Sequence, residues 1–112
     1  MRKFLMGFVF AGRGIGAALD GELNIKVMLV AAAMAVALGL QQGIDRLEWV
    51  AVVLCIGWVL ALEILNTAGE RLIDILSPGH DPRFGRVKDI LAGAVLTASV
   101  TAAVVGALVF LH

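Results

Sequence analysis

The chain has 112 residues, of which 61% are apolar and 16% are charged, and its basic and acidic residues balance. A soluble domain of this size carries about 25% charged residues, so this composition and a mean hydropathy of +0.98 indicate an integral membrane protein. Because no basic excess exists, the sequence predicts no nucleic-acid partner. We expect a single all-α domain over residues 1–112.

Residues 3–20 predict an amphipathic helix on the membrane surface. Lys3 and Arg13 are available to its wet side. The basic start and the apolar residues after it also imitate a signal peptide, but Arg13 and nearby glycines interrupt that pattern. The apolar side recurs at helical spacing and consists of Phe4, Phe8, Ala11, Ile15 and Leu19.

The next apolar segment predicts a first membrane span over about residues 24–40. Its uncharged run, residues 27–40, is short for a span and needs its neighbours to reach across the hydrocarbon core. Small residues at Ala31, Ala35 and Gly39 repeat every four positions. Such a row lets helices approach closely, although alanine can also simply fill an apolar helix.

The second span, over about residues 48–76, combines an apolar start with a polar stripe. Residues 49–62 carry no charge, and four polar side chains then follow at offsets of 3, 7 and 11 residues from the first. At about 100° per residue they share one helix face. A carboxylate at the membrane boundary costs free energy unless it meets water, a partner or a metal. The stripe predicts chemistry at the lipid–water interface and consists of Glu63, Asn66, Glu70 and Asp74.

Residues 88–111 predict the third span. Its last 22 residues, 90–111, carry no charge and reach about 33 Å as a helix, enough for the hydrocarbon core. Three such spans do not seal a polar stripe within one subunit, so we expect a homo-oligomer. A further row of small residues at four-residue spacing favours close helix packing and consists of Ala94, Ala98, Ala102 and Gly106.

The basic residues indicate how the chain is oriented. Eight of the nine Lys and Arg residues flank the spans on one side, and only Arg46 lies between the first two spans. The positive-inside rule makes the side with eight cations cytoplasmic. We therefore expect the N-terminus and the loop at 77–88 in the cytoplasm, and the turn at 41–48 and His112 outside.

Further polar residues gather on the same side. Glu22 precedes the first span, and Lys88 and Asp89 open the third, so all three are expected near Glu70 at one membrane surface. Paired carboxylates suit Mg²⁺, and a lysine beside them suits a polyphosphate. The alternative is that these charges only anchor helix ends.

Other patterns predict no chemistry. Residues 12–16 resemble the start of a dinucleotide-binding fingerprint, but no strand precedes them. No Cys/His cluster has zinc spacing. The single Cys55 is interpreted as a packing residue, and His80 as either a solvated loop residue or a ligand.

Three sequence segments carry a family resemblance. They are ELNIK at 22–26, ALEILNTAGERLID at 61–74 and GRVKDILAGAVL at 85–96, with 18 residues from Glu70 to Lys88. Together they resemble the small prokaryotic diacylglycerol kinase and undecaprenol kinase family. The resemblance implies a homotrimeric lipid kinase of a bacterial inner (plasma) membrane, with three spans and a surface helix. It also implies ATP and Mg²⁺ in active sites that are shared between subunits and face the cytoplasm.

The resemblance further implies a role for each matching residue. Glu63 matches the general base, and Glu22 and Glu70 match the metal-binding carboxylates. The residues implied to contact nucleotide are Phe10, Glu22, Glu70, His80, Asp81, Lys88 and Asp89, and those implied to support the site or contact substrate are Lys3, Asn66 and Asp74.

The reaction that we expect is in-line transfer of the ATP γ-phosphoryl group to a lipid alcohol. Residues 22–24 and 92–96 look more like the undecaprenol branch, whereas residues 85–86 look like the diacylglycerol branch, so undecaprenol is favoured. One alternative is a small membrane transporter or channel with a carboxylate-lined site, and another is a structural membrane adaptor. A transporter would be expected to carry its polar stripe through mid-membrane, whereas residues 49–62 are uncharged.

Overall fold

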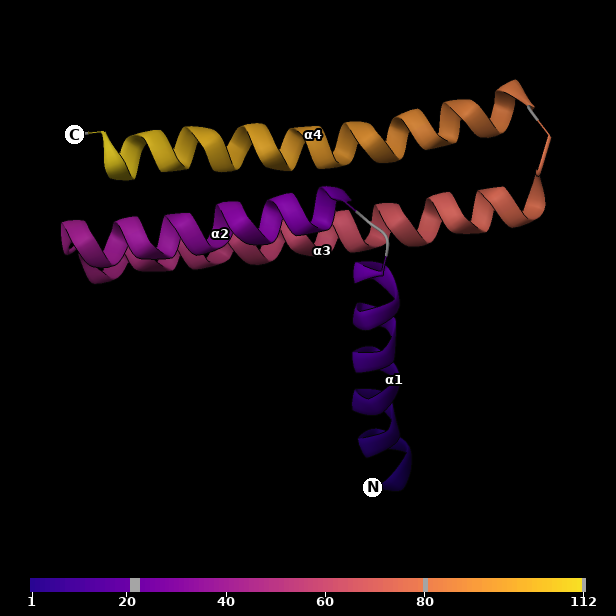
Figure 1. The fold of residues 1–112 in the computed structure, drawn as a ribbon, viewed down its shortest axis with the longest axis horizontal. Helices are drawn as coiled ribbons and strands as arrows, with labels where there is room; N and C mark the ends of the chain where they lie inside the picture. Colours follow the sequence, from indigo (N-terminus) through magenta and orange to yellow (C-terminus); the bar gives the residue numbers. More distant parts are fainter. Residues whose placement is uncertain (21–22, 80, 112) are drawn as a thin grey trace.

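Four α-helices make up the chain in the structure, a computed structural model that describes residues 1–20, 23–79 and 81–111. The described ranges contain no strand, which confirms the expected all-α fold. Three helices lie side by side in a bundle, and the N-terminal helix projects sideways from it (Figure 1). In chain order the helices are α1 (Arg2–Leu19), α2 (Leu23–Gln42), α3 (Arg46–Leu76) and α4 (Pro82–Phe110).

The helices α2, α3 and α4 are long and apolar enough to cross a membrane, with 20, 31 and 29 residues. At about 1.5 Å per residue, α2 extends roughly 30 Å, the thickness of the hydrocarbon core. The longer α3 and α4 reach past the start of α2 at one end of the bundle (Figure 1). Their surplus length therefore extends the bundle beyond α2 on that side.

The local sequence explains where α3 and α4 begin. Asp45 caps α3 through a capping box, since its Oδ1 accepts from the Glu48 N–H at 2.9 Å and its own N–H donates to the Glu48 carboxylate at 3.2 Å. Gly43, with φ 65°, makes the preceding turn without the steric cost of a side chain. Asp81 caps α4, and Pro82 follows at a position where no helix N–H is lost.

The alternating direction of the three long helices gathers charge at one end of the bundle. The end of α3 and the start of α4 lie there, and the start of α2 lies on the same side, further along the bundle (Figure 1). The turn at 43–45 and the C-terminal end of α4 lie at the other end. Arg46, the first residue of α3, belongs to the second end. The helix-terminal cations of the first end are Lys26, Arg71, Arg83, Arg86 and Lys88.

The small residues predicted to pack helices tightly do so only in part. Gly39 is buried, and a Cβ built on it would lie 2.8 Å from Cη2 of Trp49. Ala98 is also buried, at 2% exposure. By contrast, other members of both rows border an apolar cavity of about 380 Å³ between α2, α3 and α4, namely Ala31, Ala35, Ala102 and Gly106.

We expect Gly39→Ala to destabilise the turn between α2 and α3. The added methyl group meets the rigid Trp49 ring, and overpacking of this kind costs about 1–3 kcal/mol, against a gain of about 1 kcal/mol in helix propensity. The matched control is Gly57→Ala on α3, where nothing lies within 4 Å of the new Cβ. Thermal unfolding in detergent should give a lower midpoint for Gly39→Ala than for Gly57→Ala. Equal midpoints would contradict this close packing.

Candidate active site

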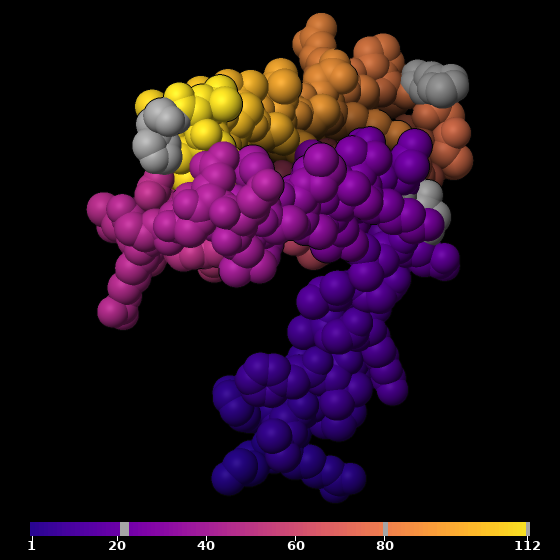
Figure 2. Space-filling view, turned by 60° about the vertical axis from the view of Figure 1, so that its left-hand side comes forward, coloured from indigo at the N-terminus to yellow at the C-terminus, as the bar shows by residue number. Residues whose placement is uncertain are grey.

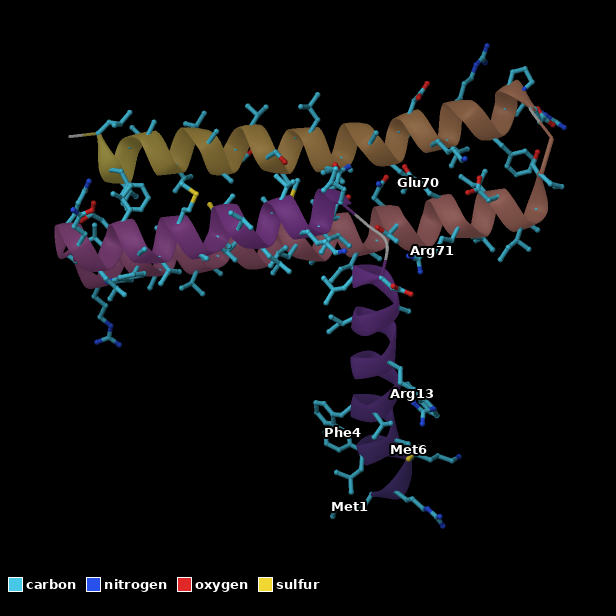
Figure 3. The ribbon with its side chains drawn as sticks, in the orientation of Figure 1. Met1, Phe4, Met6, Arg13, Glu70 and Arg71 are labelled. Carbon is cyan, nitrogen blue, oxygen red and sulfur yellow. The ribbon has the colours of Figure 1, made fainter. Side chains whose placement is uncertain are left out.

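The polar stripe of α3 runs from a buried end to an exposed end. Glu63 is 2% exposed and Asn66 is 8% exposed, whereas Glu70 is half-buried and the Asp74 side chain is 65% exposed. Glu70 projects into the space between α3 and α4 (Figure 3). Because the four positions share one helix face, a ligand lying along the stripe would pass gradually from a protein-shielded to a solvated environment.

Asn66 and Glu70 are hydrogen-bonded to each other. The Asn66 Nδ2 donates to the Glu70 Oε1 over 3.3 Å, the contact expected for residues four apart on a helix. The other end of the amide, Oδ1, is buried and has no hydrogen-bond partner among the described residues. A buried acceptor without a partner costs about 1–3 kcal/mol. Such an atom is free to accept from a water or a ligand or to coordinate an ion.

Asp74 and Lys88 join the end of α3 to the start of α4. The Lys88 Nζ lies 2.6 Å from the Asp74 Oδ1. Both side chains border a cavity of about 290 Å³ beside the loop that connects the two helices. Asp89, the next residue of α4, is exposed. The structure thus brings Lys88 to the solvated end of the stripe, where a phosphate could reach it.

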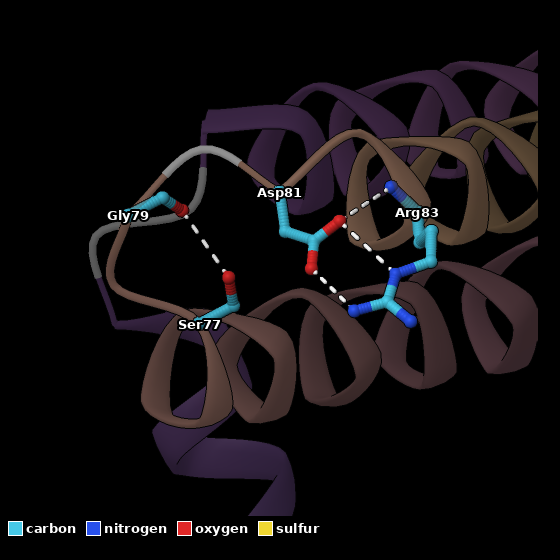
Figure 4. A network of polar contacts seen from close by, with 4 residues as sticks. All are labelled: Ser77, Gly79, Asp81 and Arg83. Atoms are coloured by element: carbon cyan, nitrogen blue, oxygen red, sulfur yellow. Dashed lines mark hydrogen bonds and ion pairs between the residues drawn. The ribbon is translucent and has the colours of Figure 1, made fainter.

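The loop between α3 and α4 is held by short-range polar contacts (Figure 4). The Ser77 hydroxyl donates to the Gly79 carbonyl over 3.3 Å. Asp81 accepts from the Arg83 backbone N–H at 2.9 Å, and its second carboxylate oxygen pairs with the Arg83 guanidinium at 2.9 Å. These bonds, the side-chain one foremost, hold the pKa of Asp81 below its usual range. Asp81 therefore serves as a helix cap, and its predicted nucleotide contact stays a prediction.

Two predicted site residues on α1 are not near the stripe of their own chain. Lys3 is exposed, and Phe10 is 58% exposed with the Arg13 guanidinium 5.9 Å from its ring centre. Both belong to the arm that projects from the bundle (Figure 2). Glu22 and His80 lie outside the described residues. One chain therefore brings together Glu63, Asn66, Glu70, Asp74 and Lys88 on α3 and α4.

Arg71, which the sequence indicated only as one of the cytoplasmic charges, has specific partners in the structure. Its guanidinium donates to the carbonyls of Ala17 at 2.9 Å and Asp20 at 3.2 Å. These partners lie 54 and 51 residues away in the chain. No local pattern could have indicated a contact over that separation.

The oxygen groups of the stripe have the chemistry that Mg²⁺ prefers. Within the described ranges no three His, Cys, Asp or Glu side chains are close enough to enclose a metal. Mg²⁺, however, is usually held by one or two carboxylates together with phosphate oxygens and water. The Glu70 carboxylate and the buried Asn66 Oδ1 fit this open mode of binding.

Sequence comparisons relate the chain to prokaryotic lipid kinases. The family described as prokaryotic diacylglycerol kinase matches residues 9–110. An undecaprenol kinase of Bacillus subtilis (strain 168) is 35% identical over 111 residues, which cover 99% of this chain and 90% of that protein. A diacylglycerol kinase of Escherichia coli (strain K12) is 28% identical over 95 residues, which cover 85% of this chain and 78% of that protein. A diacylglycerol kinase of Shigella flexneri matches with the same identity and coverage.

We expect Lys88→Met to weaken ATP binding without unfolding the protein. Its ion pair with Asp74 is solvent-exposed, and such pairs contribute little to stability, so the thermal midpoint should stay close to that of the unmodified chain. Loss of one charge-assisted hydrogen bond to phosphate should lower ATP affinity about tenfold or more. The matched control is Arg86→Met, which removes the same charge two residues earlier on α4. Equal ATP affinities for the two variants would contradict this role of Lys88.

Proposed function

This chain belongs to the prokaryotic diacylglycerol kinase family, a family of lipid kinases, and we propose that it transfers the ATP γ-phosphoryl group to undecaprenol. The observation that carries the proposal is the burial gradient of the α3 stripe, from Glu63 at 2% exposure to Asp74 at the solvated end. A lipid alcohol needs an acceptor for its proton at the shielded end. A polyphosphate needs cations at the solvated end.

In this proposal Glu63 is the general base. It takes the proton of the lipid hydroxyl while that oxygen forms a bond to the γ-phosphorus of ATP, and the bond from this phosphorus to the β-phosphate bridging oxygen breaks to release ADP. Glu63 lies seven residues, or about 10 Å along the helix, from Glu70. This separation allows the lipid hydroxyl and the γ-phosphate to meet at the depth of Glu63, while the rest of the nucleotide remains near the membrane surface.

The remaining residues position and neutralise the phosphates. In phosphoryl transfer, positioning and charge neutralisation supply most of the catalysis. Lys88, held at the solvated end beside Asp74, would contact phosphate oxygens, and Asp89 would contact the nucleotide. Glu70 and Glu22 would hold Mg²⁺, which supplies compensating charge when bound. Asn66 would orient the Glu70 carboxylate through the hydrogen bond from its Nδ2.

We propose undecaprenol over diacylglycerol as the lipid substrate. The relative named undecaprenol kinase matches more of this chain at higher identity, 35% over 111 residues against 28% over 95 residues for the diacylglycerol kinases. The segments at 22–24 and 92–96 also resemble the undecaprenol branch more than the diacylglycerol branch. Both lipids present a primary alcohol at the membrane surface, so the chemistry assigned to Glu63 is the same for either.

The proposal includes a homotrimer in which α1 lies on the cytoplasmic membrane surface. Phe4 and Arg13 point to opposite sides of α1, and Phe4 is on the side toward which α2 runs (Figure 3). The Phe4 and Phe8 rings meet edge to face at 5.2 Å, which makes one apolar side. With the bundle upright in a membrane, this side meets lipid and the other meets water. Lys3 and Phe10 would then contribute to the stripe of a neighbouring subunit.

The orientation of the chain can be tested with cysteine labelling in a Cys55→Ala background. Gln41→Cys at the end of α2 should react with an impermeant thiol reagent added to intact cells, and Gly79→Cys should not. Both positions are exposed, and neither has the positive φ that makes Gly43 intolerant of a side chain. The reverse pattern would place the stripe away from cytoplasmic ATP and exclude the kinase proposal.

The base and metal roles predict different kinetic defects. Glu63→Gln should lower kcat by about 100-fold or more while leaving Mg-ATP affinity nearly unchanged, because the base acts mainly in the transition state. Glu70→Gln should abolish turnover and also weaken Mg-ATP binding. The measurement is a nucleotide titration beside a lipid phosphorylation assay on the same preparation.

The matched control for both variants is Glu48→Gln, the same chemical change at the opposite end of α3. A glutamine there preserves the capping box, so activity and stability should both persist. Should Glu63→Gln lose Mg-ATP binding as completely as Glu70→Gln does, the base assignment is wrong.

A further inference from the structure

Arg71 connects α3 to the end of α1 at the level of the stripe. It follows Glu70 directly in the chain, but it projects from α3 toward α1, whereas Glu70 projects toward α4 (Figure 3). Its Nη1 donates to the Ala17 carbonyl at 2.9 Å and its Nη2 donates to the Asp20 carbonyl at 3.2 Å. One guanidinium therefore binds two carbonyls, three residues apart, at the C-terminal end of α1.

The end of α1 has particular need of such a donor. The last carbonyls of a helix lack partners within the helix and form the negative end of its dipole. No basic residue lies in the last turn of α1, and the helix itself offers the Ala17 carbonyl only the Asp20 backbone N–H, at 3.3 Å. Arg71 adds a second donor to the Ala17 carbonyl, a donor to the Asp20 carbonyl, and a positive charge. The rigid fork of a guanidinium can hold two carbonyls in fixed geometry, which a lysine ammonium on its flexible stem does not do as well.

Apolar packing does little to fix α1 on α3. Ala18 is the only described residue of α1 that is buried. A cavity of about 380 Å³ separates part of the two helices and is bordered by Ile64, Thr67 and Arg71 from the α3 side. The rest of α1 stands away from the bundle as an arm (Figure 2). Among the described residues, the two hydrogen bonds from the Arg71 guanidinium, called the fork below, are a directional restraint on where α1 ends.

This restraint lies close in the sequence to the two carboxylates assigned to Mg²⁺. Asp20, whose carbonyl Arg71 holds, precedes Glu22 by two residues in the chain. Arg71 itself is the neighbour of Glu70. A shift of the α1 end would therefore move the segment that leads to Glu22 relative to the helix that carries Glu70, and would also redirect Lys3 and Phe10.

We propose that Arg71 is a positioning residue of the kinase, which fixes the end of α1 on α3 beside Glu70, a proposed metal ligand. The inference rests on the proposed function for its kinetic part. Its structural part, the restraint of α1 by the fork, is independent of that function. The competing explanation is that Arg71 only adds a cytoplasmic positive charge, in which case lysine should replace it fully.

The first test measures distances between spin labels in a Cys55→Ala background. Labels at Gly7→Cys on α1 and Ile75→Cys on α3 occupy open or exposed positions, and labelled chains are diluted with unlabelled ones so that distances within one chain dominate. With Arg71 intact the distribution should be narrow. With Arg71→Lys and Arg71→Gln it should broaden or shift, whereas the matched Arg46→Lys at the other end of α3 should leave it unchanged. An unchanged distribution in Arg71→Lys overturns the proposal.

The second test measures kinase activity against Mg²⁺ concentration for the same variants. Loss of a group that orients metal ligands typically lowers metal affinity about 10-fold to 100-fold. The Mg²⁺ concentration for half-maximal activity should rise by that factor in Arg71→Lys, with kcat at saturating Mg²⁺ less affected. A lower kcat with unchanged Mg²⁺ dependence overturns the positioning role. If the unmodified chain phosphorylates no lipid, the proposed function fails, and the spin-label distances still decide whether the fork restrains α1.

Discussion

A carboxylate in the hydrocarbon of a bilayer costs about 3 kcal/mol unless it meets water, a cation or a metal, and α3 carries Glu63, Glu70 and Asp74 within its last 14 residues. This cost determines the depth at which the bundle can stand in a membrane. The exposed end of the stripe has to reach water, and the buried end has to be shielded by protein. The extra length of α3 and α4 beyond the start of α2 meets both requirements. At the solvated end α4 also contributes Lys88.

The same turns of α3 serve two neighbours on different faces. Glu70 projects toward α4, and Arg71 projects toward α1 (Figure 3), so the helix separates the proposed reaction from the arm that would lie on the membrane surface. The proposed reaction site and the end of α1 therefore lie at the same depth along α3. This arrangement makes the position of α1 part of the site's geometry, even though no described residue of α1 reaches the stripe within one chain.

Periodicity and hydropathy alone predicted the all-α fold, the three long apolar helices and the shared face of the stripe, because each depends on residues close together in the chain. Other features depend on contacts that no local pattern encodes. The Arg71 fork joins residues more than 50 positions apart, and the buried Asn66 Oδ1 follows from tertiary packing. The loop predicted at 77–88 is shorter in the structure, because α4 already begins at Pro82, and Asp81 and Pro82 together are a helix-start signal.

The most direct measurement offers the purified, unmodified chain ATP labelled at its γ-phosphate in mixed micelles containing either undecaprenol or diacylglycerol, with and without Mg²⁺. The account predicts that label enters the lipid, that it does so only with Mg²⁺, and that undecaprenol is phosphorylated with the higher kcat/KM. Faster labelling of diacylglycerol would show that the choice of lipid substrate is wrong and would leave the lipid kinase activity in place. Release of label as inorganic phosphate, with none in either lipid, would contradict the account of the α3 stripe as a site of phosphoryl transfer to lipid.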